Sequence, residues 1–361
     1  MKNLIIFLIT FGITVLGIEF FLKTTRITPP TLKYYNPVYG SLNRPNIDYY
    51  KAVEGMYVGK TNYDGRFREN YPKRKDGKKT LRILLMGDSF VEGIDVFSHN
   101  HFARYMEELL GQKLNRKVEV IDFGRGNCAI QASSYYFADY IAKEYDADIV
   151  LYFTEWRDIF NIGNGTGYPS TCFLLDSTKN LMAAYTWKQS PEYAIHKKLT
   201  ANPILKYYES SAYFRLLYRA VARIKITGMP IMTFGKFAGT QKEQSYASYT
   251  SNDSISLLTQ KLYDTVNHYD KGQVIWIVRN KPYNAPSIIE YMKNKNFKYV
   301  ALSDTFNDNY IKGTKTDAYY FKASGAYGGH WNNDGHKAMG YFLSNRIYNN
   351  LASYNTPNYE K

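Results

Sequence analysis

A serine follows directly after an apolar segment that has the composition of a buried strand. Residues 81–87 read LRILLMG, and Asp88 and Ser89 come next in the sequence. A short apolar run bounded by turn residues predicts a strand that is buried on both faces. A serine presented at the end of such a strand can act as a nucleophile when a base lies beside it. The alternative is an ordinary serine at the start of a helix.

Polar clusters also stand at three other places in the pattern. Gly124-Arg125-Gly126-Asn127 follows a second apolar run, Glu155-Trp156-Arg157-Asp158 follows a third, and GGHWNNDGH (328–336) precedes the last helical segment. The carboxyl ends of parallel strands share one edge of a sheet, so these clusters are expected to meet there. A serine nucleophile, a histidine base and the Ser89 and Gly126 amides, with a third donor, would make an acyl-transfer site with an oxyanion hole.

The elements that would position these residues alternate between strands and helices. Strands are expected at 81–87, 117–124, 147–153, 273–280 and 299–304, and helices at 100–114, 129–145, 254–269, 287–296 and 333–351. This alternation predicts a three-layer α/β/α sandwich with a central parallel sheet. The pattern lapses over 161–255, which we interpret as an insertion that carries one helix at 210–225.

Over residues 60–350, apart from the insertion, the chain resembles the SGNH (GDSL-type) hydrolases. GDSF (87–90) matches the nucleophile motif of that family, which implies Ser89, and we place Asp88 beside it in the catalytic set. HWNNDGH resembles the final motif, which implies that His330 and not His336 is the catalytic base and that Asn332 helps to start the helix. TNYDGRFR (61–68) resembles the arm of membrane-anchored members. The resemblance implies a flavodoxin-like fold and esterase, lipase or carbohydrate O-acyl chemistry.

Two motifs depart from the family pattern at the expected oxyanion hole. The third family motif is Gly-x-Asn-Asp, whereas this chain has EWRD, with Arg157 where the asparagine is expected. The glycine of the second motif corresponds to Gly126 or, on the strictest spacing, to Asn127. A guanidinium has five N–H donors and a permanent charge, so Arg157 could stabilise an oxyanion or bind an anionic group of the substrate. The alternative is that Arg157 turns away and pairs with Asp158 or Glu155.

The carboxylate of the expected triad is also displaced. In the family it lies two or three residues before the histidine, and those positions hold Gly328 and Tyr327. A substitute could come from elsewhere in the same loop, where the candidates are Asp304, Asp308 and Asp317. A Ser-His dyad is the other possibility, because the carboxylate mainly orients and stabilises the imidazolium.

Two classes of function follow from these residues. The first is a membrane-tethered extracytoplasmic serine esterase or O-acyltransferase that acts on an acylated cell-surface glycan or envelope polymer. The second is a catalytically degenerate module of the same fold that binds glycan or scaffolds an envelope assembly.

One segment, residues 4–22, is apolar enough to cross a membrane, provided that Glu19 is tolerated near its end. No small-residue cleavage pattern follows it, which favours an uncleaved signal anchor with the domain outside the cytoplasm. The expected organisation is an anchor at 1–26, an extended arm at 27–79 and the α/β domain at 80–354.

The composition of the chain limits the classes of molecule that it is expected to bind. The formal charge is +14 over 361 residues, which suggests an acidic partner such as an anionic glycan, although KRKDGKK (73–79) is the only dense basic cluster. No zinc-type spacing and no RNA-binding aromatic signature appears in the sequence, so we expect no metal, no cofactor and no nucleic acid.

Cys128 and Cys172 could form one disulfide or remain two thiols. His99 and His101 open a predicted helix and are expected at the surface.

Overall fold

The structure of the protein is a computed structural model. It describes residues 2–25, 28, 33–36, 40–52, 56–77, 80–125, 138–155, 172–184, 188, 193–194, 197, 201, 210–217, 257–279, 286–302 and 330–355.

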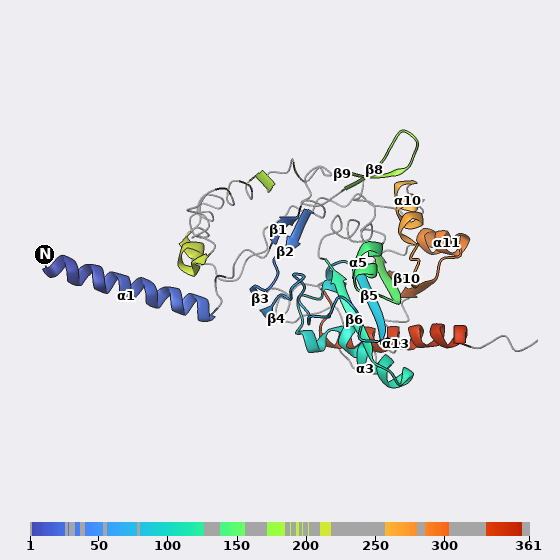
Figure 1. The fold of residues 1–361 in the computed structure, drawn as a ribbon, viewed down its shortest axis with the longest axis horizontal. Helices are drawn as coiled ribbons and strands as arrows, with labels where there is room; N and C mark the ends of the chain where they lie inside the picture. Colours follow the sequence, from blue (N-terminus) through green and yellow to red (C-terminus); the bar gives the residue numbers. More distant parts are fainter. Residues whose placement is uncertain are drawn as a thin grey trace, which may run out of the picture.

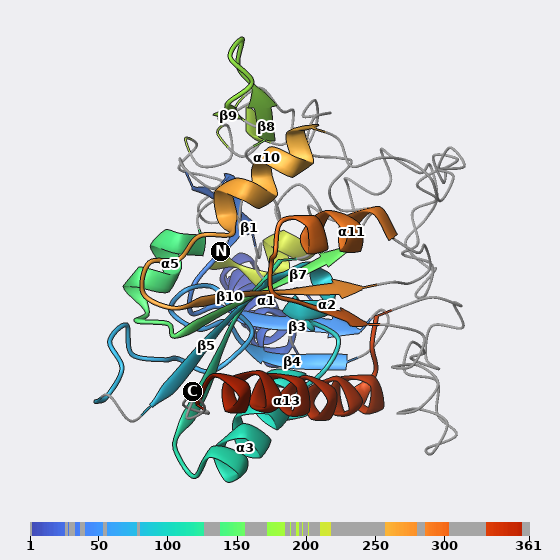
Figure 2. The same cartoon turned by 90° about the vertical axis from the view of Figure 1, so that its right-hand side faces the viewer.

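Five strands form one parallel sheet in the α/β domain (Figure 2). They are β5 (Leu81–Gly87), β6 (Val118–Gly124), β7 (Ile149–Glu155), β10 (Gln273–Arg279) and β11 (Tyr299–Leu302). Their order across the sheet is β11-β10-β7-β5-β6, and every neighbouring pair is parallel. All five correspond to strands predicted from sequence, because continuous apolar runs are typical of strands that are covered on both faces.

Helices cover both faces of this sheet. On one face lie α3 (Phe102–Leu114) and α13 (Asn333–Asn355), which pack on Ile83 and Leu85 of β5. On the other lie α5 (Ala138–Glu144), α10 (Leu257–Val266) and α11 (Pro286–Asn294), which pack on Leu84 and Met86. Successive side chains of a strand point to opposite faces, so one strand contributes to two separate cores. The predicted three-layer α/β/α sandwich is confirmed.

The order of the strands places a topological switch point at β5. From β5 the chain crosses to β6 on one side, and the next strand, β7, lies on the opposite side of β5. In open parallel sheets the functional crevice lies beyond the carboxyl ends of the strands at such a point. β5 ends at Gly87, directly before Asp88 and Ser89.

The segment before the domain contains more regular structure than the expected extended arm. Strands β1 (Lys33–Asn36) and β2 (Gly40–Asn43) form an antiparallel hairpin, and β3 (Asp48–Ala52) pairs in the same way with β4 (Met56–Lys60). A third hairpin, β8 (Cys172–Leu175) with β9 (Leu181–Ala184), lies in the expected insertion. Two-stranded ribbons with tyrosines and glycines lack the long apolar runs by which the central strands are recognised in the sequence.

The basic cluster at residues 73–75 is matched by acidic side chains. The ion pairs are Lys73 with Asp64 at 2.8 Å and Glu144 at 3.2 Å, Arg74 with Asp146 at 3.1 Å, and Lys75 with Asp148. Asp146 and Asp148 stand between α5 and β7, so the cluster fastens the arm to the domain. Its positive charge is therefore used within the chain.

Before these elements stands α1 (Lys2–Thr25), a helix that is long and apolar enough to cross a membrane (Figure 1). At a rise of 1.5 Å per residue its 24 residues extend about 36 Å. Among its side chains only that of Leu22 is buried.

Candidate active site

Ser89 is the first residue of a short helix, α2 (Ser89–Glu92), which begins directly beyond the carboxyl end of β5. Asp88 caps this helix, because its carboxylate accepts a hydrogen bond from the Phe90 amide at 2.9 Å. The structure thus places Asp88 as the residue that turns the chain from strand into helix. A backbone amide at the start of a helix points toward the space where an acyl oxygen would be bound. Ser89 itself is partly exposed.

His330 lies against Ser89 although the two residues are far apart in the sequence. The Nε2 atom of His330 is 2.6 Å from the Ser89 Oγ atom. His330 stands just before α13, and the Asn332 side chain accepts a hydrogen bond from the Gly335 amide at 2.9 Å. Asn332 therefore caps α13, as the sequence motif implies. This cap fixes the residue at which α13 begins, and with it the position of the His330 imidazole, two residues before Asn332.

A carboxylate occupies the other side of the His330 ring, and it belongs to Asp95. The Nδ1 atom of His330 is 3.4 Å from the Asp95 Oδ2 atom. The side chain of Asp95 is 1% exposed, whereas that of His330 is 23% exposed. A buried carboxylate beside Nδ1 favours the tautomer with its proton on that nitrogen, which leaves Nε2 to accept a proton from Ser89. Ser89, His330 and Asp95 have the spatial order of a Ser-His-Asp triad.

Sequence reasoning missed Asp95. It stands six positions after the serine in the segment VEGIDVF, on the amino-terminal side of the chain, whereas the family pattern directs the search to the loop before His330. The helix α2 is only four residues long and ends at Gly93, which has a φ of +51°. The chain therefore reverses its direction at Gly93 and brings the Asp95 carboxylate next to the His330 ring. The glycine at position 93, a residue type that favours a left-handed turn, was the only signal in the sequence for this reversal.

Aromatic rings support the histidine from the side. The Phe90 ring centroid lies 4.9 Å from that of His330 and 5.1 Å from that of Trp331. Trp331 is 1% exposed and packs in the core that α3 and α13 share. These contacts restrict rotation of the imidazole, which is needed for a base that must face both Ser89 and Asp95.

The backbone of β6 approaches α2 at a glycine. A Cβ atom at Gly124 would lie 2.1 Å from the Glu92 amide nitrogen and 2.5 Å from the Val91 carbonyl carbon. Neither contact can be relieved by turning a side chain, because both atoms belong to the backbone of α2. Gly124 therefore permits a close approach that sets the height of α2, and of Ser89, above the sheet.

Gly124→Ala is expected to destabilise the fold by about 1–3 kcal/mol, as overpacking of a core does, and to displace Ser89. Urea unfolding gives the stability, and the rate of labelling by a fluorophosphonate reports on the serine. Gly111→Ala in α3 is the matched control, because its Cβ atom meets only the Arg116 carbonyl oxygen, at 3.3 Å. Equal unfolding midpoints for the two variants would contradict the close approach.

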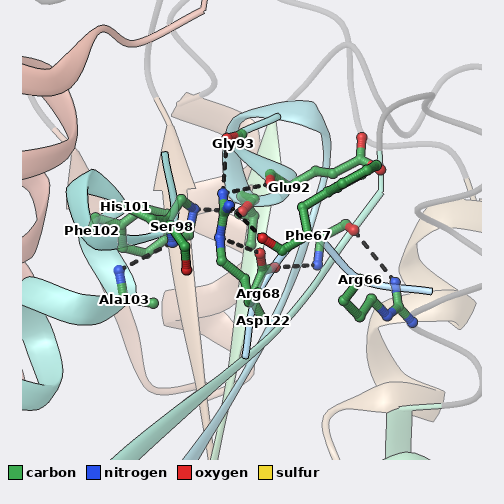
Figure 3. Close-up of polar contacts among 12 residues, drawn as sticks. Arg66, Phe67, Arg68, Glu92, Gly93, Ser98, His101, Phe102, Ala103 and Asp122 are labelled. Atoms are coloured by element: carbon green, nitrogen blue, oxygen red, sulfur yellow. Dashed lines mark hydrogen bonds and ion pairs between the residues drawn. The ribbon is translucent and has the colours of Figure 1, made fainter. Parts of the chain in front are cut away.

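Arg68 binds the other end of α2 (Figure 3). Its Nη2 atom donates to the carbonyl oxygens of Glu92 and Gly93 at 2.9 and 2.8 Å, and its Nε atom lies 3.5 Å from Asp122 Oδ2. Asp122 in turn accepts a hydrogen bond from the Gly124 amide at 2.7 Å. Burial raises the pKa of Asp122 to about 6, and the charge of Arg68 opposes that rise. The arm thus reaches into the domain and satisfies the last carbonyl groups of the helix that carries the nucleophile.

Removing one partner of this buried pair is expected to cost more than removing both. Arg68→Ala should destabilise by about 3–5 kcal/mol, because Asp122 is left as an uncompensated buried charge. The double variant with Asp122→Ala should recover part of that loss. The penalty of Arg68→Ala should be larger at pH 8 than at pH 5, since without the arginine the pKa of Asp122 rises further and the carboxyl becomes neutral in acid.

Arg74→Ala provides the control for that cycle, because the Arg74 side chain is 77% exposed in its ion pair. It should change stability by no more than about 1 kcal/mol. Urea unfolding at both pH values measures the wild type, Arg68→Ala, Asp122→Ala, the double variant and Arg74→Ala. Additive losses in the double variant would show that Arg68 and Asp122 are not coupled.

Two further histidines lie buried behind the site. His101 donates from Nε2 to the Val91 carbonyl oxygen at 2.8 Å, and His336 accepts at Nδ1 from the Phe102 amide at 3.4 Å. Burial lowers the pKa of both rings well below the usual value. The expectation that His101 lies at the surface is wrong, because it is 0% exposed and caps α3. Both imidazoles act as neutral structural groups beneath α2.

Several residues predicted for the site lie outside the described residues. They are Gly126, Asn127, Arg157, Asp304, Asp308 and Asp317, and the side chains of both cysteines are also outside. Arg125 is described, and its amide donates to the Gly87 carbonyl oxygen at 2.9 Å, which joins the ends of β5 and β6. Within the described part of the chain, no group of three or more His, Cys, Asp and Glu side chains is arranged to hold a metal ion.

Comparisons with known proteins find likeness among solved structures. A protein from Desulfitobacterium hafniense DCB-2, described as a lipolytic protein of the G-D-S-L family, is 13% identical to this chain. The match has a TM-score of 0.30 and covers 73% of this chain and 98% of that one. A two-domain esterase active on acetylated mannans is 10% identical, with a TM-score of 0.35 over 78% and 52%. The acetyl xylan esterase AlAXEase is 12% identical, with a TM-score of 0.33 over 75% and 100%. No family model and no curated protein matches the sequence. Function is therefore inferred from the geometry of the site.

Proposed function

We propose that the protein is a serine esterase or O-acyltransferase, tethered to a membrane by α1, that acts on an acylated cell-surface glycan or envelope polymer. The observation that carries the chemistry is the chain of contacts from Ser89 Oγ to His330 Nε2 at 2.6 Å and from His330 Nδ1 to Asp95 at 3.4 Å. Asp95 lies where the carboxylate of a triad is needed, which favours an enzyme over a catalytically degenerate module. The family resemblance and the net positive charge support a glycan substrate.

The proposed reaction uses the three groups in turn. His330 Nε2 accepts the hydroxyl proton as Ser89 Oγ bonds to the acyl carbon, and Asp95 stabilises the imidazolium that forms. The bond from the acyl carbon to the sugar oxygen then breaks, and His330 returns its proton to that oxygen. In the second half the oxygen of a water molecule or an acceptor hydroxyl bonds to the acyl carbon while His330 Nε2 takes its proton. The bond from the acyl carbon to Ser89 Oγ then breaks, and His330 returns the proton to Ser89.

An assay on isolated envelope polysaccharide tests the substrate class. The wild-type protein should release free acid from acylated polymer, or move the acyl group to an added acceptor, and Ser89→Ala should do neither. Loss of polymer-bound acyl groups is measured by ester analysis before and after incubation. Hydrolysis of small aryl esters without any effect on the polymer would contradict the proposed substrate and would show an esterase that acts on another class of ester.

The membrane tether has its own support. Most apolar side chains of α1 are exposed, and Glu19 within it is hydrogen-bonded to residues 211–213 of the domain. A cleaved signal peptide would lose these contacts, so they favour an uncleaved anchor.

The protein is expected to stay in the membrane fraction after carbonate washing, with residues from 27 onward outside the cytoplasm. An uncleaved apolar span of this length binds a membrane without further anchors. Protease added to intact spheroplasts should digest the domain. Full protection would reverse the proposed orientation, and release by carbonate would contradict the anchor.

A further inference from the structure

The helix α1 contains one acidic residue among exposed apolar side chains. The leucine, isoleucine and phenylalanine side chains from Leu4 to Leu16 are more than half exposed, as are Phe20 and Phe21. A helix that is apolar on all sides and not covered by protein is suited to a lipid environment. Glu19 lies three residues before Leu22, which is about 4.5 Å along the axis from the end of the apolar run. When α1 spans a membrane, Glu19 therefore lies close to the boundary between the hydrocarbon core and the headgroups.

The carboxylate of Glu19 is bound by the first turn of another helix. It accepts hydrogen bonds from the Ser211 hydroxyl and the Ala212 amide, both at 2.9 Å, and from the Tyr213 amide at 2.8 Å. Lys23, one turn along α1, lies 3.0 Å from the same carboxylate. An acidic group that satisfies the unpaired amides of a helix start is favourable, and its partners offset the cost of taking the charge out of water.

A second set of contacts fixes the same two segments. Thr28, just beyond α1, donates from its hydroxyl to the Ala212 carbonyl oxygen at 3.1 Å. Arg215 donates from Nε to the Thr28 carbonyl oxygen at 3.0 Å. Ala212, Thr28 and Arg215 are 0%, 2% and 6% exposed. Residues 210–217, which we call the docking segment, are therefore held against the end of α1 at two points (Figure 1).

The docking segment presents apolar side chains to the outside. Phe214, Leu216 and Leu217 are 53%, 37% and 43% exposed, whereas Ala212 and Arg215 face the contact with α1 and Thr28. The Ser211 hydroxyl accepts from the Phe214 amide at 3.2 Å, so the segment has its own helix cap. The side of the segment that contacts α1 and Thr28 is covered, so the side left exposed is the apolar one. Exposed apolar side chains beside a helix that enters a membrane are suited to the membrane interface.

We propose that the docking segment lies in the membrane interface, with Phe214, Leu216 and Leu217 in contact with lipid acyl chains. This inference rests on the membrane anchor of the proposed function. The partner is lipid because the segment is bonded to α1 at Glu19, where the apolar run ends, so an inserted α1 brings these side chains to the acyl boundary. The contact gives the catalytic domain a second attachment, which limits its rotation about the anchor.

Quenching by brominated lipid tests the proposal on the full-length protein. A tryptophan is placed at the segment by Phe214→Trp, and a control tryptophan by Tyr140→Trp on α5, where the native side chain is 64% exposed. Both proteins are reconstituted in phosphatidylcholine vesicles, with and without lipid brominated near the ester end of its acyl chain. The wild-type spectrum, with its 4 tryptophans, is subtracted. We expect lipid bromine to quench most of the emission added by Phe214→Trp and none of that added by Tyr140→Trp.

Variants of α1 test the link through Glu19. Glu19→Leu removes the one charged side chain among residues 4–22, so membrane insertion should be retained while quenching at position 214 falls toward that of the control. Lys23→Met removes only a cation that is 56% exposed and leaves the three hydrogen bonds from residues 211–213, so quenching should persist. Quenching unchanged by Glu19→Leu would show that Glu19 does not hold the segment at the membrane.

Flotation of the vesicles separates the two possible failures. Protein that does not float with the vesicles contradicts the anchor and the inference together. Protein that floats but shows no quenching at position 214 overturns the inference alone, and a blue-shifted, unquenched emission would mean that protein covers the segment. Fluorophosphonate labelling of the same samples reports separately on the catalytic part of the proposed function.

Discussion

Ser89→Ala is expected to abolish turnover of ester substrates and covalent labelling by a fluorophosphonate. The loss should be on the order of 10⁶-fold, as for removal of the nucleophile from a Ser-His-Asp protease, and His330→Ala should cause a loss of similar size. The physical reason is the 2.6 Å contact between Ser89 Oγ and His330 Nε2. The serine is not a useful nucleophile until the imidazole can accept its proton, and the imidazole has no function in the reaction without the serine.

The double variant should therefore lose little more than either single variant. Initial rates on an aryl acetate, normalised to the concentration of folded protein, measure the effect. His268→Ala is the control for loss of an imidazole, because the His268 side chain is 75% exposed in its contact with Asp270. Additive losses, or labelling that survives His330→Ala, would contradict the assignment of His330 as the base.

Asp95→Asn is expected to lower kcat/KM by about 10⁴-fold with little change in unfolding temperature. Asparagine has the shape of aspartate, so the buried position is filled, but it can hold the imidazole in the wrong tautomer and cannot stabilise an imidazolium. Asp334→Asn is the matched control, because that carboxyl is exposed in the first turn of α13, close to His330 in the sequence. It should retain nearly full activity.

The same variant decides between a triad and a dyad. Activity of Asp95→Asn close to that of the wild type would mean that Ser89 and His330 work without this carboxylate. A large loss accompanied by a fall in unfolding temperature would point to a structural role, and Asp95→Glu would then be compared with it in the same assay.

The sheet could be predicted from sequence because its strands carry a strong local signal. Runs such as LRILLMG and QVIWIVR contain few polar residues, and only a strand covered on both faces uses such runs at this length. The positions of Ser89 and Asn332 could also be predicted, since each stands at the junction of an element with a turn. The motif around each is local in the chain.

Contacts between distant segments could not be predicted in this way. Asp95 reaches His330 because Gly93 reverses the chain after one turn of helix, and no periodicity encodes that reversal. His101 was expected at the surface because polar residues open many helices, but the approach of α13 and α2 covers it. Arg68 reaches α2 across 24 residues of sequence. Each of these outcomes depends on how elements pack.

Identification of the residue that a fluorophosphonate modifies tests the central claim most directly. The full-length protein is treated with the probe, digested and mapped by mass spectrometry, beside Asp95→Asn and a heat-unfolded sample. The triad predicts a single adduct on Ser89 in the folded wild-type protein, much slower labelling in Asp95→Asn and none after unfolding. Absence of any adduct on Ser89 in folded protein, or equal labelling of folded and unfolded samples, would contradict an activated serine at this site.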